Sequence, residues 1–305
     1  MRNKHIVSIS TFSRNLLANW VALFAEILAA FFLTPFIVAS LGLTTYGIWS
    51  LLNGLVGYMG LIDVGIQGST GRYINYYMAK KDHLRINEVI NTSLFFLSGV
   101  SIFGIMLAVI FSNFFIDIFT KTPIELLSDI QIVLPIMAVN LWLAFLIAVF
   151  RHTLNAHDRF EISNGINLII LFIRVAGVIT ALNLGYDLIG LIFANVFASI
   201  IGCIIYFFAA KNINETLKIS WQYANLQRFK EMWKFGTAVF VTRGANQLIY
   251  QADQILVMIF FGPKMVGIYS IATMILQNAS KLIEQINGTL YPSVMKSGSN
   301  KDLVG

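Results

Sequence analysis

Eight long apolar runs divide this chain of 305 residues, and they constrain its fold more than any other feature. A helix that crosses the hydrocarbon core of a bilayer needs about 20 mostly apolar residues, and each run has that length. The runs lack the polar–apolar alternation that a membrane β-barrel requires. The sequence therefore predicts an all-α integral membrane protein, a polytopic bundle of about eight transmembrane helices. The runs occupy approximately residues 15–41, 46–66, 90–112, 130–150, 163–183, 188–210, 235–261 and 266–290.

The shortage of charged residues supports this class of fold. The chain is 57% hydrophobic and only 12% charged, whereas a soluble domain averages about 25% charged residues. The single cysteine, Cys203, cannot form a disulfide or a cysteine-based metal site within one chain. No glycine-rich phosphate loop follows a strand, and no histidine falls inside an apolar run. We therefore predict no enzyme activity, no metal and no cofactor.

The distribution of Lys and Arg predicts the orientation in the membrane. Of the 21 such residues, 16 fall in the two termini or in loops on one side, and only Lys121 and Lys264 fall in loops on the other. Basic residues favour the cytoplasmic side, so both termini are expected in the cytoplasm. This bias also explains the net charge of +6 without a nucleic-acid partner. The other three residues, Arg174, Arg243 and Lys281, lie within apolar runs.

The longest cytoplasmic segment, residues 211–234, mixes aromatic and aliphatic side chains with basic ones. Such a composition is typical of an amphipathic helix that lies at the membrane surface. A linker with interfacial tryptophan anchors is the simpler interpretation, and a regulatory or partner-binding role is the alternative. The apolar members are Trp221, Leu226, Phe229, Met232 and Trp233.

An internal repeat relates the seventh and eighth runs to the first and second at a constant offset of 220 residues. The repeat pairs Gly42 with Gly262 and Gly47 with Gly267, and these four glycines are predicted to be structural. Random apolar helices would share leucines and isoleucines, but they would not readily align their glycines without a gap. The further pairs are Ala25/Ala245, Leu28/Leu248, Ile48/Ile268, Ser50/Ser270, Ile66/Ile286, Gly68/Gly288, Lys81/Lys301 and Asp82/Asp302.

The repeat predicts the domain organisation. Residues 1–210 form a six-helix lobe, residues 211–234 a cytoplasmic linker, and residues 235–305 the first two helices of a second, parallel lobe. Two lobes that face each other across a cavity are typical of transporters. We expect four further helices in a complete second lobe, so the chain is expected to be a truncated product or fragment. The alternative is a short protein that completes itself by association.

Polar residues inside the apolar runs identify a candidate cavity. Arg243, Gln247 and Gln254 share one helical face, and Asn278 and Lys281 repeat the pattern in the next run. With Arg174 they predict a cationic, water-filled cavity that could hold a diphosphate. The alternative interpretation is pairing between helices, which is common in membrane bundles. Four acidic residues are candidates for ion coupling or charge pairing: Glu26, Asp63, Asp253 and Glu284.

Two stretches carry a family resemblance. The first runs from Leu41-Gly42-Leu43-Thr44-Thr45-Tyr46-Gly47-Ile48-Trp49-Ser50 through Leu61-Ile62-Asp63-Val64-Gly65 to Gly71-Arg72-Tyr73-Ile74. The second is Asp253-Gln254-Ile255-Leu256 followed by Gly262 and Gly267-Ile268-Tyr269-Ser270. They resemble the polysaccharide flippases, the Wzx-type O-antigen transporters of the multidrug/oligosaccharidyl-lipid/polysaccharide exporter superfamily. Members typically have twelve or more helices in two six-helix lobes.

The resemblance implies a flippase that moves undecaprenyl-diphosphate-linked oligosaccharide across the bacterial inner membrane by ion-driven alternating access. Such a protein contacts membrane lipids and works beside a polysaccharide polymerase and chain-length machinery. One alternative is a drug/cation antiporter of the same fold, although basic residues within the helices favour an anionic substrate. Another is a membrane scaffold that transports nothing.

Overall fold

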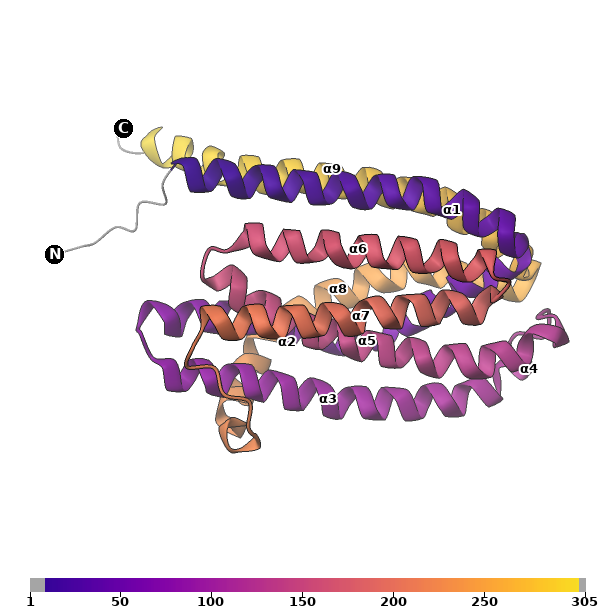
Figure 1. Ribbon diagram of the computed structural model, residues 1–305, viewed down its shortest axis with the longest axis horizontal. Coiled ribbons are helices and arrows are strands. Elements are labelled where there is room, and N and C mark those ends of the chain that lie inside the picture. Colours follow the sequence, from indigo (N-terminus) through magenta and orange to yellow (C-terminus); the bar gives the residue numbers. More distant parts are fainter. Residues whose placement is uncertain (1–8, 302–305) are drawn as a thin grey trace.

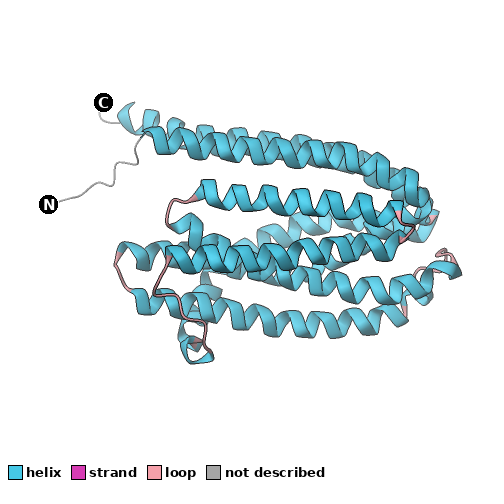
Figure 2. Ribbon diagram, viewed as in Figure 1, coloured by secondary structure: helices cyan, strands magenta, loops and turns pink. Residues whose placement is uncertain are grey.

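The computed structural model describes the backbone of residues 9–301. It also describes the side chains in this range, except those of residues 9–16, 62–64, 116, 238–240, 242–251, 284 and 286–301. All regular secondary structure in the described range is helical (Figure 2), which confirms the all-α prediction. The α-helices are α1 (Ile9–Met59), α2 (Leu61–Ala79), α3 (His83–Asn113), α4 (Phe115–Ile118), α5 (Leu127–Ala156), α6 (Phe160–Asn183), α7 (Asp187–Ile213), α8 (Leu226–Phe261) and α9 (Pro263–Lys301), with 3₁₀ turns η1 (Ile124–Leu126) and η2 (Trp221–Tyr223).

Among the described residues, five helical segments are long and apolar enough to cross a membrane. The first of them covers most of the first two predicted runs, because α1 consists of two helices joined at a kink. The second run was predicted to continue to residue 66, but α1 ends at Met59 and residues 61–66 begin α2. The last two predicted runs lie on α8 and α9, whose described side chains include one shorter apolar stretch, Ala252–Phe261. The protein is therefore a polytopic membrane bundle. The five segments are Leu17–Met59, His83–Asn113, Ile124–Ala156, Phe160–Asn183 and Asp187–Ile213.

Two glycines from the repeat reverse the chain direction in the same way. Gly42 has φ 78° and ψ 161°, and Gly262 has φ 83° and ψ 178°. Residues with a Cβ rarely adopt this left-handed region, so glycine is the residue that permits such a turn. Each glycine ends one long helix and starts the next, as the 220-residue offset predicts.

The long helices run side by side along one axis (Figure 1). The start of α1 and the end of α9 lie at the same end of the bundle, which we call the terminus end. The bend within α1 and the turn between α8 and α9 lie at the opposite end (Figure 1). Gly42 forms the kink in α1, and Gly262 ends α8 at this turn. α9 packs along α1, and α8 packs on α2.

Glycines allow α8 and α9 to approach the first helices closely. A Cβ at Gly47 of α1 would overlap the backbone of Pro263, and one at Gly267 of α9 would overlap the backbone of α1. A Cβ at Gly65 of α2 would stand 2.9 Å from the carbonyl oxygen of Gly236 in α8. These helices can pack this closely only because the side chains are absent, an arrangement common between membrane helices. The structural role predicted for Gly47 and Gly267 agrees with this packing.

The core lies between the helices, and large apolar side chains also cover the outside. Ile90, Val149 and Tyr206 belong to one buried cluster, while Leu51 and Leu134 belong to a second. Outward-facing aromatic residues include Phe172, which is 74% exposed. A bilayer solvates such side chains, whereas water would not.

Residues 211–234, predicted as a linker with the composition of an amphipathic helix, do not form one separate helix. α7 ends at Ile213, residues 214–220 are non-helical, and η2 follows before α8 begins at Leu226. Phe229 and Met232 therefore lie on the first turns of α8, and Met232 is buried. The last apolar and basic residues of this segment belong to the start of a longer helix, α8, that packs against α2 and α3.

Candidate functional site

A polar cavity of about 360 Å³ lies between α1, α5, α6 and α9. Its charged lining consists of Glu26 from α1, Arg151 from α5, Arg174 from α6 and Lys281 from α9. Asn167, two turns before Arg174 on α6, adds an amide. Three cations therefore surround one carboxylate in a space otherwise walled by alanine, leucine, isoleucine and valine side chains.

Arg174 differs from the other two cations in having a buried donor without a hydrogen-bond partner among the described residues. This donor is its Nε atom. Glu26 lines the same cavity, but no ion pair within 4 Å joins these two described side chains. An unpartnered buried donor is costly, and such sites are rare in native proteins unless a ligand or water completes them.

Hydrogen bonds between helices fix the cavity wall. The Tyr206 hydroxyl on α7 lies 2.8 Å from the Asn167 Oδ1 and 2.8 Å from the carbonyl oxygen of Ser163. Tyr206 is fully buried, so this contact holds α6 against α7 behind the cavity. On the other side, Asn164 Nδ2 donates to Asn19 Oδ1 at 2.5 Å and joins α6 to α1. These contacts orient the face of α6 that carries Arg174.

The structure brings together three of the residues predicted from sequence: Arg174, Lys281 and Glu26. Asn278 lies on α9 close to Lys281 and is half-buried, but it does not line this cavity. The side chains of four other candidates lie outside the described residues, so their predicted roles remain predictions: Arg243, Gln247, Asp63 and Glu284.

Gln254 and Asp253 lie elsewhere, at the contact between α8 and α9. Gln254 is buried, and its Nε2 lies 3.2 Å from Ser270 Oγ and 3.4 Å from Ser50 Oγ. The Tyr269 hydroxyl donates to Asp253 Oδ2 at 2.8 Å. In this structure both residues join helices, which is the alternative that the sequence left open. Ser50 and Ser270 are themselves a repeat pair, so Gln254 bridges equivalent positions of the two copies.

Arg151 is the cavity residue that the sequence assigned to a loop. The predicted apolar run ended at residue 150, but α5 continues to Ala156. Residues 151–156 contain no glycine or proline, so nothing in this stretch stops the helix. The absence of helix-stop signals would have placed Arg151 on the helix, whereas the end of the apolar run placed it in the loop.

Comparison with known proteins agrees with this architecture. The family described as Polysaccharide biosynthesis protein matches residues 12–297. A protein called "Putative O-antigen transporter" of Shigella flexneri is 27% identical over 262 residues, covering 84% of this chain and 60% of that protein. "Uncharacterized membrane protein EpsK" of Bacillus subtilis (strain 168) is 24% identical over 260 residues, covering 85% and 51%. The chain thus spans between half and three-fifths of the length of these relatives.

Solved structures show the same fold at low sequence identity. The MATE multidrug transporter DinF-BH, solved as a complex, matches with a TM-score of 0.73 and 14% identity, over 94% of this chain and 65% of that one. The lipid II flippase MurJ in an inward closed conformation matches with a TM-score of 0.56 and 16% identity, over 87% and 55%. Since the family match extends over nearly the whole chain, this membrane bundle belongs to the polysaccharide biosynthesis protein family.

Proposed function

We propose that the protein is a membrane flippase that carries a diphosphate-linked oligosaccharide, anchored on a polyprenyl lipid, from the cytoplasmic to the outer leaflet of the bacterial inner membrane. The observation that carries the proposal is the cavity in which Arg151, Arg174 and Lys281 surround a single carboxylate. The family and the name of the O-antigen transporter relative support a role in polysaccharide export.

The cavity suits a diphosphate for three chemical reasons. A guanidinium presents a planar fork of donors that matches phosphate oxygens, and a lysine adds a mobile point charge. The buried Nε of Arg174 would gain the acceptor that it lacks among the described residues. In addition, the cavity's excess of positive charge would complement the negative charge of the diphosphate.

Glu26 is the residue that could couple transport to an ion gradient. It lies among the cations on α1, and a carboxylate inside a membrane protein is a frequent proton or cation site. We assign it this role: Glu26 offsets the cations when the cavity is empty and takes up a proton or cation when the diphosphate enters. The parallel repeat, with matching glycine turns at Gly42 and Gly262, would supply the two units that rock against each other.

Charge-removing variants in the producing cell test the proposal. Arg174→Gln, Lys281→Gln and Arg151→Gln should each abolish or strongly reduce surface polysaccharide while the protein stays in the membrane at the parental level. Lys264→Gln is the matched control, because Lys264 is an exposed cation outside the cavity. Normal export by all three cavity variants would defeat the cationic-cavity mechanism.

A reconstituted assay separates this function from its alternatives. Proteoliposomes that contain the protein should flip a fluorescent polyprenyl-diphosphate sugar, and free inorganic diphosphate should compete. Export of cationic drugs without movement of this lipid would instead indicate an antiporter of the same fold. Loss of surface polysaccharide in a deletion strain, together with the absence of any flipping, would indicate a scaffold.

A further inference from the structure

The non-helical segment 214–220, which we call the strap, is bound to the side of α3 by two asparagines one turn apart. Asn87 Nδ2 donates to the carbonyl oxygen of Thr216 at 2.8 Å, and its Oδ1 accepts from the amide of Lys218 at 2.8 Å. Asn91 repeats the pattern one step along, donating to the carbonyl oxygen of Lys218 at 2.7 Å and accepting from the amide of Ser220 at 2.9 Å. The two side-chain amides thus pair with the strap as a neighbouring strand would.

Burial makes these strap contacts stable. Asn87 is 5% exposed and Asn91 is fully buried. Buried hydrogen bonds of this kind are costly to break, because each leaves a polar group without water. The upstream half of the connection between α7 and α8 is therefore fixed to α3.

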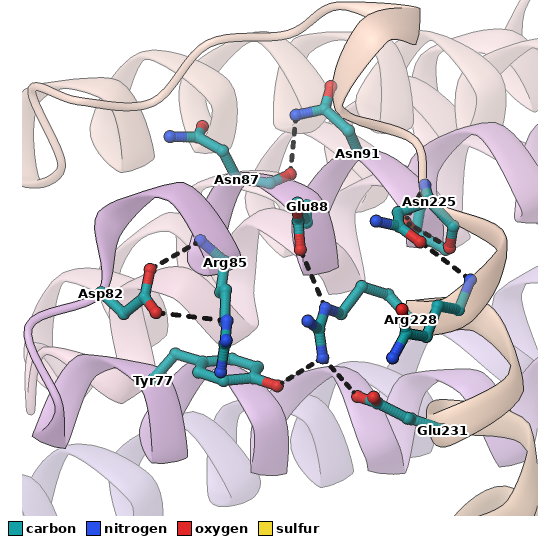
Figure 3. Close-up of polar contacts among 11 residues, drawn as sticks. Tyr77, Asp82, Arg85, Asn87, Glu88, Asn91, Asn225, Arg228 and Glu231 are labelled. Carbon is teal, nitrogen blue, oxygen red and sulfur yellow. Dashed lines mark hydrogen bonds and ion pairs between the residues drawn. The ribbon is translucent and has the colours of Figure 1, made fainter.

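A second set of contacts, which we call the latch, holds the first turn of α8 (Figure 3). The amide of Asn225, which caps α8, donates to Thr92 Oγ1 at 2.9 Å. Three residues further on, Arg228 Nε pairs with Glu88 Oε2 at 2.8 Å, and Nη1 donates to the Tyr77 hydroxyl at 2.8 Å. Nη1 also pairs with Glu231 Oε2 at 2.6 Å, and the Arg228 side chain is only 11% exposed.

Arg228 joins three helices at one point. Glu88 and Thr92 come from α3, Tyr77 from α2, and Arg228 itself from α8. Burial lowers the pKa of Arg228, but the hydrogen bonds to Glu88 and Glu231 outweigh this effect, so the pKa lies above the ordinary value. The guanidinium is therefore a permanent cation that ties α8 to the terminus end of the first lobe.

The strap and the latch are separated by a short turn. η2 (Trp221–Tyr223) lies between Ser220, the last strap contact, and Asn225, the first latch contact. Trp221 is 71% exposed and touches Phe95 of α3 edge-on, with ring centroids 4.9 Å apart. This turn is the place in the connection where backbone torsions can change while the strap stays bound.

Movement of α8 would be transmitted to the cavity. α8 and α9 are joined by the turn at Gly262, by Tyr269–Asp253 and by Gln254–Ser270, so they form one unit. α9 contributes Lys281 to the cavity wall. Displacing the start of α8 would therefore shift this wall relative to α1 and α6.

We propose that the latch is a gate: the Arg228 contacts with Glu88 and Tyr77 hold the α8–α9 unit closed against α2 and α3, and their release lets the unit swing about η2 while the asparagine-bound strap stays in place. The proposal rests on the alternating access of the proposed function. The Lys and Arg bias predicts that the terminus end faces the cytoplasm, so the latch would close the cytoplasmic side. It adds which contacts close that end and where the connection bends.

Cysteine labelling measures the gate without requiring transport. Ala29 lines the cavity, so an Ala29→Cys reporter in a Cys203→Ser background reports access from the cytoplasmic face of inside-out vesicles to a membrane-impermeant maleimide. Arg228→Gln and Glu88→Gln should each speed labelling by about 5-fold or more, the range of a typical coupling between two states. Arg228→Lys, which keeps the charge but loses the fork, should fall between these variants and the parent.

Arg159→Gln is the matched control. Arg159 pairs with Glu161 at 2.9 Å at the N-terminus of α6, and neither residue belongs to the strap or the latch. The labelling rate of this variant should equal that of the parent. Parental rates in Glu88→Gln and Arg228→Lys would overturn the gate, and so would an equal rise in the control. If labelling rises while the cavity variants export normally, the gate stands and the substrate assignment fails.

Discussion

Replacing Gly65 with alanine tests whether the absence of a side chain at this position allows α2 and α8 to pack closely. The new Cβ would lie 2.9 Å from the carbonyl oxygen of Gly236, 3.1 Å from its carbonyl carbon and 3.2 Å from its Cα. These are backbone atoms, so no side-chain rotation can relieve the overlap. α8 would have to move by about 0.5 Å to restore ordinary contact, and packed interiors resist such shifts.

Gly68 offers a matched control on the same helix, because a Cβ there meets nothing within 4 Å. Alanine improves helix propensity equally at both positions, by about 0.8–1.0 kcal/mol, so this gain cancels in the comparison. What remains is the overpacking, which costs roughly 1–3 kcal/mol. At about 2–4 °C per kcal/mol, Gly65→Ala should unfold roughly 2–12 °C below Gly68→Ala.

Thermal unfolding of the purified protein in detergent, followed by tryptophan fluorescence, measures the difference. Gly236→Ala should be the least stable, since its Cβ would stand 2.6 and 2.7 Å from the carbonyl carbon and Cα of Gly65. From highest to lowest, the expected midpoint temperatures are those of Gly68→Ala, the parent, Gly65→Ala and Gly236→Ala. Equal midpoints for Gly65→Ala and Gly68→Ala would refute the close crossing.

Two further predictions rest on the described contacts, and a third rests on the distribution of Lys and Arg. Gln254→Leu removes the bridge between Ser50 and Ser270 and should lower the free energy of unfolding by about 1 kcal/mol, measured by the same thermal assay. Asn91→Asp keeps the acceptor for the strap but loses the donor, so trypsin should cleave after Lys218 faster than in the parent; unchanged cleavage would contradict the strap. Reporter fusions test the orientation: alkaline phosphatase should be active after residue 122 and inactive after residue 220, and activity at 220 would reverse the assignment.

Part of the candidate site could be predicted from the pattern of polar residues in the sequence. Arg174 and Lys281 could be singled out because charge inside an apolar run is expensive and needs a reason. The sequence alone did not distinguish residues that line a cavity from residues that pair between helices, and the structure contains both kinds. Arg174 lines the cavity with an Nε that is unpartnered among the described residues, while Gln254 bonds serines on neighbouring helices.

The sequence by itself determined the class of protein, the all-α bundle and the matching turns at Gly42 and Gly262. These features depend on local rules: apolar length sets a membrane helix, and only glycine adopts the turn conformation readily. The 220-residue offset predicted the equivalent turns because both copies must solve the same local problem.

Only the tertiary structure decided which polar residues meet. Arg151 and Lys281 are 130 positions apart, and their convergence depends on how α5 and α9 pack around α1 and α6. Likewise, no local pattern reveals that Asn87 and Asn91 bind a strap about 130 residues away or that Arg228 meets Glu88. Helix packing selects such pairs through shape and glycine spacing across the whole bundle, so the partners can be identified only once all the helices are in place.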